Sequence, residues 1–260
     1  MNRLPTVFLS HGSPMHALDP GGAGRAWQAI AAGLPRPRAV LVISAHWETS
    51  LPMFSGRERH DTIHDFSGFP APLYDLRYDA PGAPDLAQQA AALLRASGFT
   101  AAVDGCRGLD HGAWVPLRWM YPDADVPVLQ LSVQTAFGAD HHLRVGAALA
   151  PLASEGVLVI GSGHVTHNLR DWALHRHEAA TLDYVPRFAG WLQDALASGD
   201  REALVAWRER APGAARAHPT EEHFLPLFVA LGAAGKGATA ERVYASVEGA
   251  ALSMDAYRFN

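Results

Sequence analysis

The chain has 260 residues, of which 48% are hydrophobic and 18% are charged, a composition typical of a globular protein with a substantial core. The formal net charge is −5 and the lysines and arginines are spread along the sequence, so a basic face for nucleic acid is not expected. The apolar runs are of strand length, and none approaches the roughly 20 residues of a membrane-spanning helix, so no membrane partner is expected.

Short apolar runs alternate with Ala- and Leu-rich stretches of helical periodicity. The predicted strands, in chain order, span residues 6–10, 39–44, 126–132, 157–161 and 242–247. The predicted helices span residues 86–96, 139–153, 180–197 and 223–234. This alternation predicts an α/β protein with a mostly parallel central sheet.

Two stretches lie outside the alternation. Residues 47–82 are rich in proline, glycine and aromatic side chains, and loops of this length inside a compact domain are usually functional. Residues 211–220 contain Pro212, Gly213 and Pro219 and could form a linker, but too little chain follows them for a second domain. We therefore predict one domain over residues 1–260.

Histidine and cysteine are used very unequally. The chain has 14 histidines and one cysteine, Cys106, which cannot form an intramolecular disulfide. With no evident signal peptide, this predicts a reducing, cytoplasmic location. A thiolate metal site is excluded, so a transition metal would bind imidazoles and carboxylates. A dispersed set of surface histidines would have the same composition. The positions of the histidines in the sequence must therefore decide between a metal site and ordinary surface residues.

Several histidines follow predicted strands. His11 comes directly after the first predicted strand, and one residue separates His46 from the end of the second. The fourth predicted strand leads into His164 and His167. Ligands of open α/β sheets bind outside the carboxyl ends of the strands, so these imidazoles are expected at one edge of the sheet. A lone histidine after a strand is more often an ordinary loop residue, but three such cases favour a functional site.

Two other histidines stand beside acidic residues. His111 follows Asp110 in GLDHGAW, and this aspartate could orient the imidazole if the fold brings their side chains together. His223 opens the last predicted helix and is preceded by Glu221 and Glu222. These glutamates are also explained as helix-start residues, because the helix dipole favours anions there.

Familiar catalytic motifs are missing from the sequence. It contains no HExxH, no CxxC, no GxGxxG and no P-loop, and Ser162 in IGSGH lacks the spacing of a nucleophile elbow. Zinc-protease, dithiol, nucleotide and serine-hydrolase chemistry are therefore not indicated by these motifs.

Eight ordered motifs resemble those of the DODA-type extradiol ring-opening dioxygenases of the LigB superfamily. They are FLSHGSPM, VISAHWET, IHDFSGFPAPLYDLRY, GLDHGAW, YPDADVPVLQLS, GSGHVTHNLRD, HPTEEHFLPL and SMDAYRF, and they extend from about residue 5 to the C-terminus. The resemblance implies an α/β/α sandwich, a mononuclear non-haem Fe(II) site, O2 as co-substrate and a catechol as substrate. Related proteins also carry Zn(II) at this site, so either metal agrees with the resemblance.

The resemblance also implies residue roles. The metal ligands would be His11, His46 and His223. His167 would be an acid/base or an additional ligand, with His164 a poorer candidate because family members vary there.

Two further roles follow from the same resemblance. His111 would lie beside the ligands or contact the substrate. LigB enzymes acting on protocatechuate use a carboxylate as third ligand, so Glu221 and Glu222 stay alternatives to His223.

The chemistry of ring opening suits these residues. Three protein ligands leave metal positions for a catecholate and O2. A neutral imidazole can accept the hydroxyl proton, the role expected of His167 with His111 as helper. Four aromatic residues of the long loop could wall the ring or simply pack the loop: Trp47, Phe66, Phe69 and Tyr74.

Two other functions compete with ring opening. A zinc-dependent hydrolase could use the same histidine cluster to activate a water molecule. A non-enzymatic binding protein would have no need for histidines at three strand ends.

Overall fold

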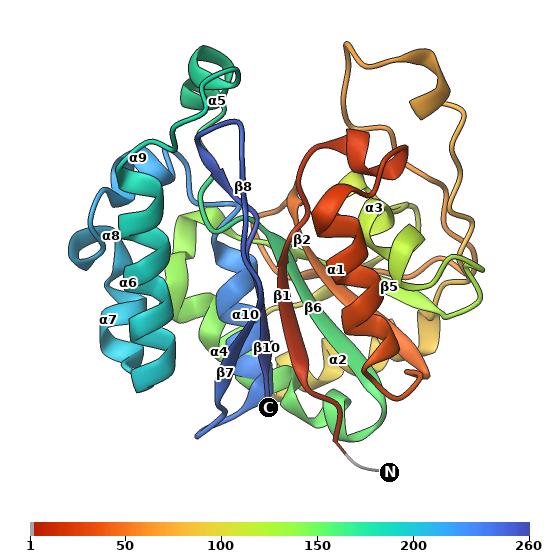
Figure 1. Cartoon of the computed structure of the whole chain (residues 1–260). Helices are drawn as coiled ribbons and strands as arrows, with labels where there is room; N and C mark the ends of the chain where they lie inside the picture. The colour runs from red at the N-terminus through yellow and green to blue at the C-terminus, as the bar shows by residue number, and fades with distance from the viewer. Residues whose placement is uncertain (1–2) are drawn as a thin grey trace.

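The strongest apolar runs of the sequence form the centre of the sheet. They are β1 (Thr6–Ser10), β2 (Ala39–Glu48), β5 (Val128–Val133) and β6 (Val157–Gly163), which pair in parallel in the order β5-β2-β6-β1. Helices cover both faces of these strands, which explains why they are continuously apolar rather than alternating. Their carboxyl ends meet at the upper edge of the sheet in Figure 1, a computed structural model that describes residues 3–260.

Shorter strands extend the sheet at its two sides. They are β3 (Met53–Ser55) and β4 (Ala102–Asp104) beyond β5, and β10 (Ala256–Phe259) and β7 (Ala240–Tyr244) beyond β1. β3 is antiparallel to β5, and β10 is antiparallel to β1 and β7. A separate two-stranded sheet pairs β8 (Val247–Glu248) with β9 (Leu252–Ser253).

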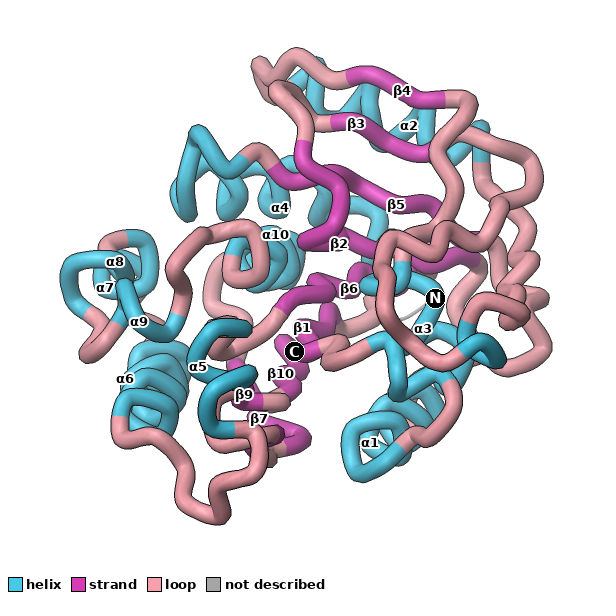
Figure 2. The backbone as a smooth tube through the Cα atoms, turned by 90° about the horizontal axis from the view of Figure 1, so that it is seen from above, coloured by secondary structure: helices cyan, strands magenta, loops and turns pink. Residues whose placement is uncertain are grey.

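Helices form a layer on each face of the sheet, as Figure 2 shows from above. One face carries α1 (Gly21–Ala32) and α3 (His111–Met120), and the other carries α2 (Pro84–Ala96), α4 (Gly138–Ser154) and α10 (Leu225–Ala234). Successive residues of β2 face opposite layers: Val40 and Val42 join the α1–α3 core, and Leu41 and Ile43 join the other. The α/β/α sandwich with a mostly parallel sheet is confirmed.

Five helices connect β6 to α10 on one flank of the molecule (Figure 1). They are α5 (Leu169–His175), α6 (Tyr184–Ser198), α7 (Arg201–Val205), α8 (Trp207–Arg210) and α9 (Ala214–Ala217). The stretch interpreted as a possible linker, residues 211–220, contains α9, which packs against α6 and α8. Three short 3-10 turns complete the structure: η1 (Pro14–Ala17), η2 (Ala71–Leu73) and η3 (Thr135–Phe137).

Several predicted boundaries were wrong. The strand predicted to end at residue 44 continues to Glu48, so His46 lies within β2 rather than after it. The helix predicted from residue 223 begins at Leu225, which leaves His223 in the preceding turn. The predicted strand 242–247 ends at Tyr244. Within residues 3–260, no helix is both long and apolar enough to span a membrane.

Candidate active site

His11 and His46 reach the sheet edge by different local structures. His11 immediately follows β1, and its backbone N–H donates to the Gly163 carbonyl of β6 at 3.1 Å. In β2, the register with β5 shifts between Ile43 and Glu48, which marks a bulge around His46. Bulges of this kind redirect a side chain at the end of a strand. This explains how a residue inside a strand can face the sheet edge.

His223 approaches from the turn that precedes α10. Its carbonyl accepts a hydrogen bond from the backbone N–H of His164 at 2.7 Å. A Cβ atom added to Gly163 would lie 2.1 Å from the same carbonyl oxygen. Because no side chain fits in that space, the glycine at position 163 permits the turn to pack on β6.

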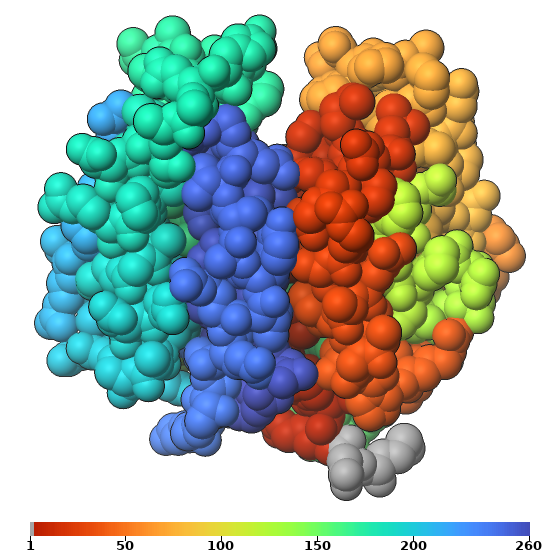
Figure 3. All heavy atoms as spheres, in the orientation of Figure 1, coloured from red at the N-terminus to blue at the C-terminus, as the bar shows by residue number. Residues whose placement is uncertain are grey.

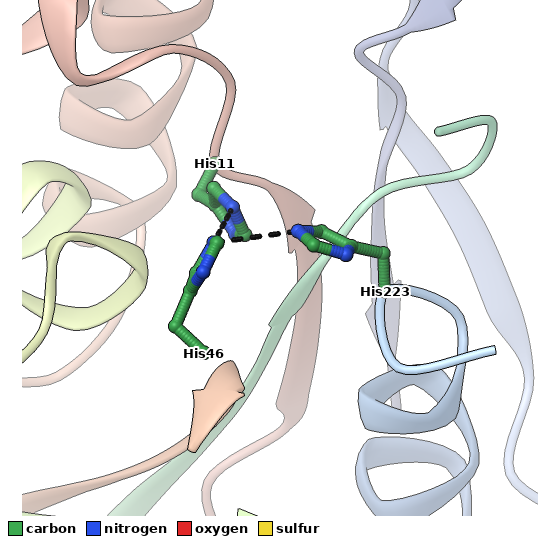
Figure 4. A group of neighbouring side chains, drawn as sticks. All are labelled: His11, His46 and His223. Carbon is green, nitrogen blue, oxygen red and sulfur yellow. Dashed lines mark hydrogen bonds between the residues drawn. The ribbon is translucent and has the colours of Figure 1, made fainter. Parts of the chain in front are cut away.

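The three imidazoles converge, as Figure 4 shows. The Nε2 atom of His46 lies 3.0 Å from Nε2 of His11 and 3.3 Å from Nε2 of His223. Burial lowers the pKa of His46 to about 4, with a further contribution from nearby His111. Burial is the larger cause that holds the pKa values of His11 and His223 well below the usual range, and the neighbouring histidines lower them further. The three rings are therefore neutral near pH 7, the form that binds metals.

Hydrogen bonds fix the protonation of two of these rings. The Ser162 hydroxyl donates to the Gly112 carbonyl, so its oxygen accepts from Nδ1–H of His11 at 3.0 Å. Glu222 accepts a hydrogen bond from Nδ1–H of His223 at 3.0 Å. Both rings consequently direct an Nε2 lone pair toward the Nε2 of His46.

The geometry of the cluster fits a metal ion. Two nitrogen ligands at about 2.1 Å from one ion and at right angles lie about 3.0 Å apart, close to the separations between these Nε2 atoms. A cation would also satisfy the converging lone pairs. His11, His46 and His223, the residues predicted as ligands, can thus hold a metal on one side and leave its other side free.

The carboxylates considered as alternative ligands lie elsewhere. Glu222 is hydrogen bonded to the far nitrogen of His223, Nδ1, and also accepts from the Thr220 hydroxyl at 2.9 Å. Glu221 pairs with Arg208 at 3.2 Å. His223, rather than either glutamate, brings its ligand atom close to those of His11 and His46.

His167 and His111 lie beside the cluster. His167, in the loop after β6, stacks on His223 with ring centroids 3.4 Å apart and planes 12° from parallel. Burial lowers the pKa of His167 well below its usual range. His111, at the start of α3, lies with its ring centroid 4.0 Å from that of His46.

His164 instead accepts the Gly12 N–H at 3.0 Å through Nε2 and holds the loop after β1.

An aspartate not singled out from the sequence contacts His111. Asp65 accepts a hydrogen bond from Nδ1–H of His111 at 2.9 Å, although the two residues are 46 positions apart. Asp110 accepts instead from Ser44 at 2.6 Å and Arg107 at 2.8 Å, and also from Gln130. The fold therefore does not bring the Asp110 and His111 side chains together, which was the condition for Asp110 to orient the ring. The HDF sequence in the long loop was the available signal for Asp65.

The long loop supplies one aromatic side chain next to the histidines. Phe66 lies edge to face with His111, with centroids 5.7 Å apart, while Phe69 and Tyr74 pack on Phe66. Trp47 is buried beneath the guanidinium of Arg107. Figure 3 shows the surface hollowed between the segment carrying α5 and part of this loop, above the ends of the central strands. Of the four aromatic residues, Phe66 lies where it can meet a ring bound near His111.

Comparisons with known proteins define the class. Residues 5–256 match the family described as the catalytic LigB subunit of aromatic ring-opening dioxygenase. The chain therefore belongs to the LigB family and is an aromatic ring-opening dioxygenase. This family and the histidine cluster together indicate a metal site. The family resemblance seen in the motifs is confirmed.

Relatives place the chain with the extradiol members of this family. It is 46% identical to a 4,5-DOPA dioxygenase extradiol of Beta vulgaris, over 99% of this chain and 97% of the relative. It is 40% identical to a protein of the same name from Escherichia coli (strain K12), over 89% of this chain and 85% of the relative. The crystal structure of an uncharacterized protein from Escherichia coli K12 superimposes with a TM-score of 0.83 at 32% identity, covering 99% and 100% of the two chains. Nothing in these comparisons favours the hydrolase alternative.

Ser162 provides a first test of the site. Ser162→Ala removes the acceptor that fixes the His11 tautomer, so we expect divalent-metal affinity to fall roughly 10- to 100-fold while the fold is kept. Competition with a chelator measures this change. Ser198→Ala, at an exposed helix end, is the matched control. Equal affinities in both variants would contradict the orienting role of Ser162.

Proposed function

We propose that the chain is an extradiol dioxygenase that opens a DOPA-like or otherwise substituted catechol with Fe(II) held by His11, His46 and His223. The convergence of their three Nε2 atoms, in a chain of this family, carries the proposal. The relatives named for 4,5-DOPA support the substrate class. Zn(II) would fit the same imidazoles but has no redox chemistry with which to activate O2.

The metal would supply positions for the catechol oxygens and O2, together with the electron transfer that O2 activation requires. The chain would supply the proton chemistry. His167 and His111 flank the three histidines, and a neutral imidazole can take a proton from a catechol hydroxyl and return it to the product. We assign the main acid/base role to His167 and a helping role to His111. Phe66 would contact the aromatic ring.

Oxygen consumption tests this proposal. After anaerobic loading with Fe(II), the protein should consume O2 with at least one member of a catechol panel that includes DOPA and release a yellow ring-opened semialdehyde. The Zn(II)-loaded protein serves as the control and should be inactive. No oxygen uptake with any catechol, together with ester or amide hydrolysis by the zinc form, would instead support the hydrolase.

A further inference from the structure

One carboxylate holds both the ring and the backbone of His111. Asp65 lies in the long loop between β3 and η2, and its Oδ1 atom accepts the backbone N–H of His111 at 2.9 Å. Its Oδ2 atom accepts Nδ1–H of the same residue at 2.9 Å. In the neutral form of the ring, this contact holds the proton on Nδ1 and leaves the lone pair on Nε2.

The His111 ring lies beside the histidine cluster. Its centroid lies 4.0 Å from that of His46 and 5.3 Å from that of His11. The Phe66 ring packs edge to face against it and restricts its rotation. The side chain is 8% exposed, and among residues 3–260 no hydrogen-bond partner occupies Nε2. Nε2 is therefore free to meet a substrate hydroxyl.

We propose that Asp65 is a positioning residue that fixes His111 in the Nδ1–H tautomer, with an unprotonated Nε2 directed at the substrate bound beside His46. This inference rests on the proposed ring-opening function. In the proton transfer, Nε2 takes the proton of a catechol hydroxyl and later gives it back to the product. Asp65 stays ionised throughout and stabilises the transient imidazolium, which no neutral acceptor at that place would do equally well.

Asp65 also lies near His46, and its distances to His46 and to His111 show which of the two contacts is a hydrogen bond. Its Oδ2 atom is 3.6 Å from Nδ1 of His46, beyond hydrogen-bond length, and 2.9 Å from Nδ1 of His111. The stronger contact is with His111. If that contact is the functional one, a change at Asp65 should alter proton transfer and leave metal binding intact.

Asp65→Asn tests the tautomer directly. An asparagine has one oxygen for two N–H donors, and the backbone N–H cannot give up its proton, whereas the imidazole can move its proton to Nε2. We therefore expect the carboxamide N–H to donate to Nδ1 and the ring to change tautomer. Imidazole ¹⁵N chemical shifts of the zinc-loaded full chain, labelled at histidine, would record the change. Asp75→Asn, an exposed carboxylate in the same segment, is the matched control.

Kinetics of the Fe(II)-loaded protein provide a second readout. Asp65→Asn should lower kcat by roughly 100-fold, with metal content unchanged and KM altered only a few-fold, because substrate binding is kept and the proton transfer that His111 performs beside His167 is impaired. In a His111→Ala background, the same substitution should have little further effect on the residual rate. Asp65→Glu, which keeps the anionic acceptor, should retain the tautomer and more of the activity.

Each contrary result has a distinct meaning. An unchanged ¹⁵N pattern in Asp65→Asn would overturn the proposal, as would an equal loss of rate with and without His111. Loss of metal from Asp65→Asn would also overturn it and make Asp65 a support for His46. If the parent protein opens no catechol, the proposed function fails, and the ¹⁵N pattern alone decides whether Asp65 sets the tautomer.

Discussion

Replacing His11, His46 or His223 with alanine is expected to abolish stoichiometric binding of a divalent metal while the fold is kept. Each residue contributes one of three Nε2 atoms that lie 3.0 to 3.3 Å from the next, so each deletion leaves only two protein ligands. Metal analysis after gel filtration measures the loss, and circular dichroism checks the fold. The Zn(II)- and Fe(II)-loaded proteins should behave alike because both ions would use the same imidazoles.

The third ligand has the sharpest control. Glu222→Ala removes the acceptor of Nδ1–H on His223 and of the Thr220 hydroxyl but none of the three converging nitrogens, so this variant should bind metal more weakly and still bind it. Full metal content in His223→Ala, with loss of metal in Glu222→Ala, would show that the carboxylate is the ligand instead.

His167→Ala is expected to keep the metal and lose most turnover, with kcat lower by about 10²–10⁴-fold. The His167 ring stacks on His223 and lies outside the group of three converging nitrogens, so its removal should leave the metal ligands in place. What it removes is an imidazole able to exchange a proton with the substrate. Metal content and kcat should be measured on the same preparation, with His177→Ala, an exposed histidine, as control.

The alternative role of His167 leads to a different outcome. His167, Glu222 and His223 also each offer a ligand atom within 4.8 Å of the others, close enough to share one metal ion. If metal content falls in parallel with the rate, His167 is a ligand rather than an acid/base.

The central strands were predictable because burial on both faces leaves continuous apolar runs. β1 was predicted at its observed bounds, and β6 at its observed start. The flanking strands β3, β4 and β10 were missed, because three or four residues form too short a pattern to recognise. The bulge that extends β2 past His46 depends on pairing with β5, which periodicity does not record.

The site was predictable where local sequence positions a residue at the sheet edge. His11 follows its strand directly, and the resemblance of the ordered motifs predicted His46 and His223 as its companions, which the structure brings together. The residues that orient these rings were not predictable in the same way. Ser162 contacts a histidine 151 positions away, and Asp65 contacts one 46 positions away. The tertiary fold brings such partners together, so their spacing in the sequence does not reveal the contact. A serine or aspartate in a sequence can also be an ordinary surface or turn residue.

Isotope transfer from ¹⁸O2 tests the central claim most directly. The Fe(II)-loaded protein would be mixed with a catechol that supports oxygen uptake, or with DOPA if none does, under ¹⁸O2, and the product analysed at once by mass spectrometry. We expect a ring-opened product heavier than the substrate by both atoms of one O2 molecule. A product whose added oxygen comes only from water, or an unchanged catechol with no label, would contradict the assignment of this chain as a ring-opening dioxygenase.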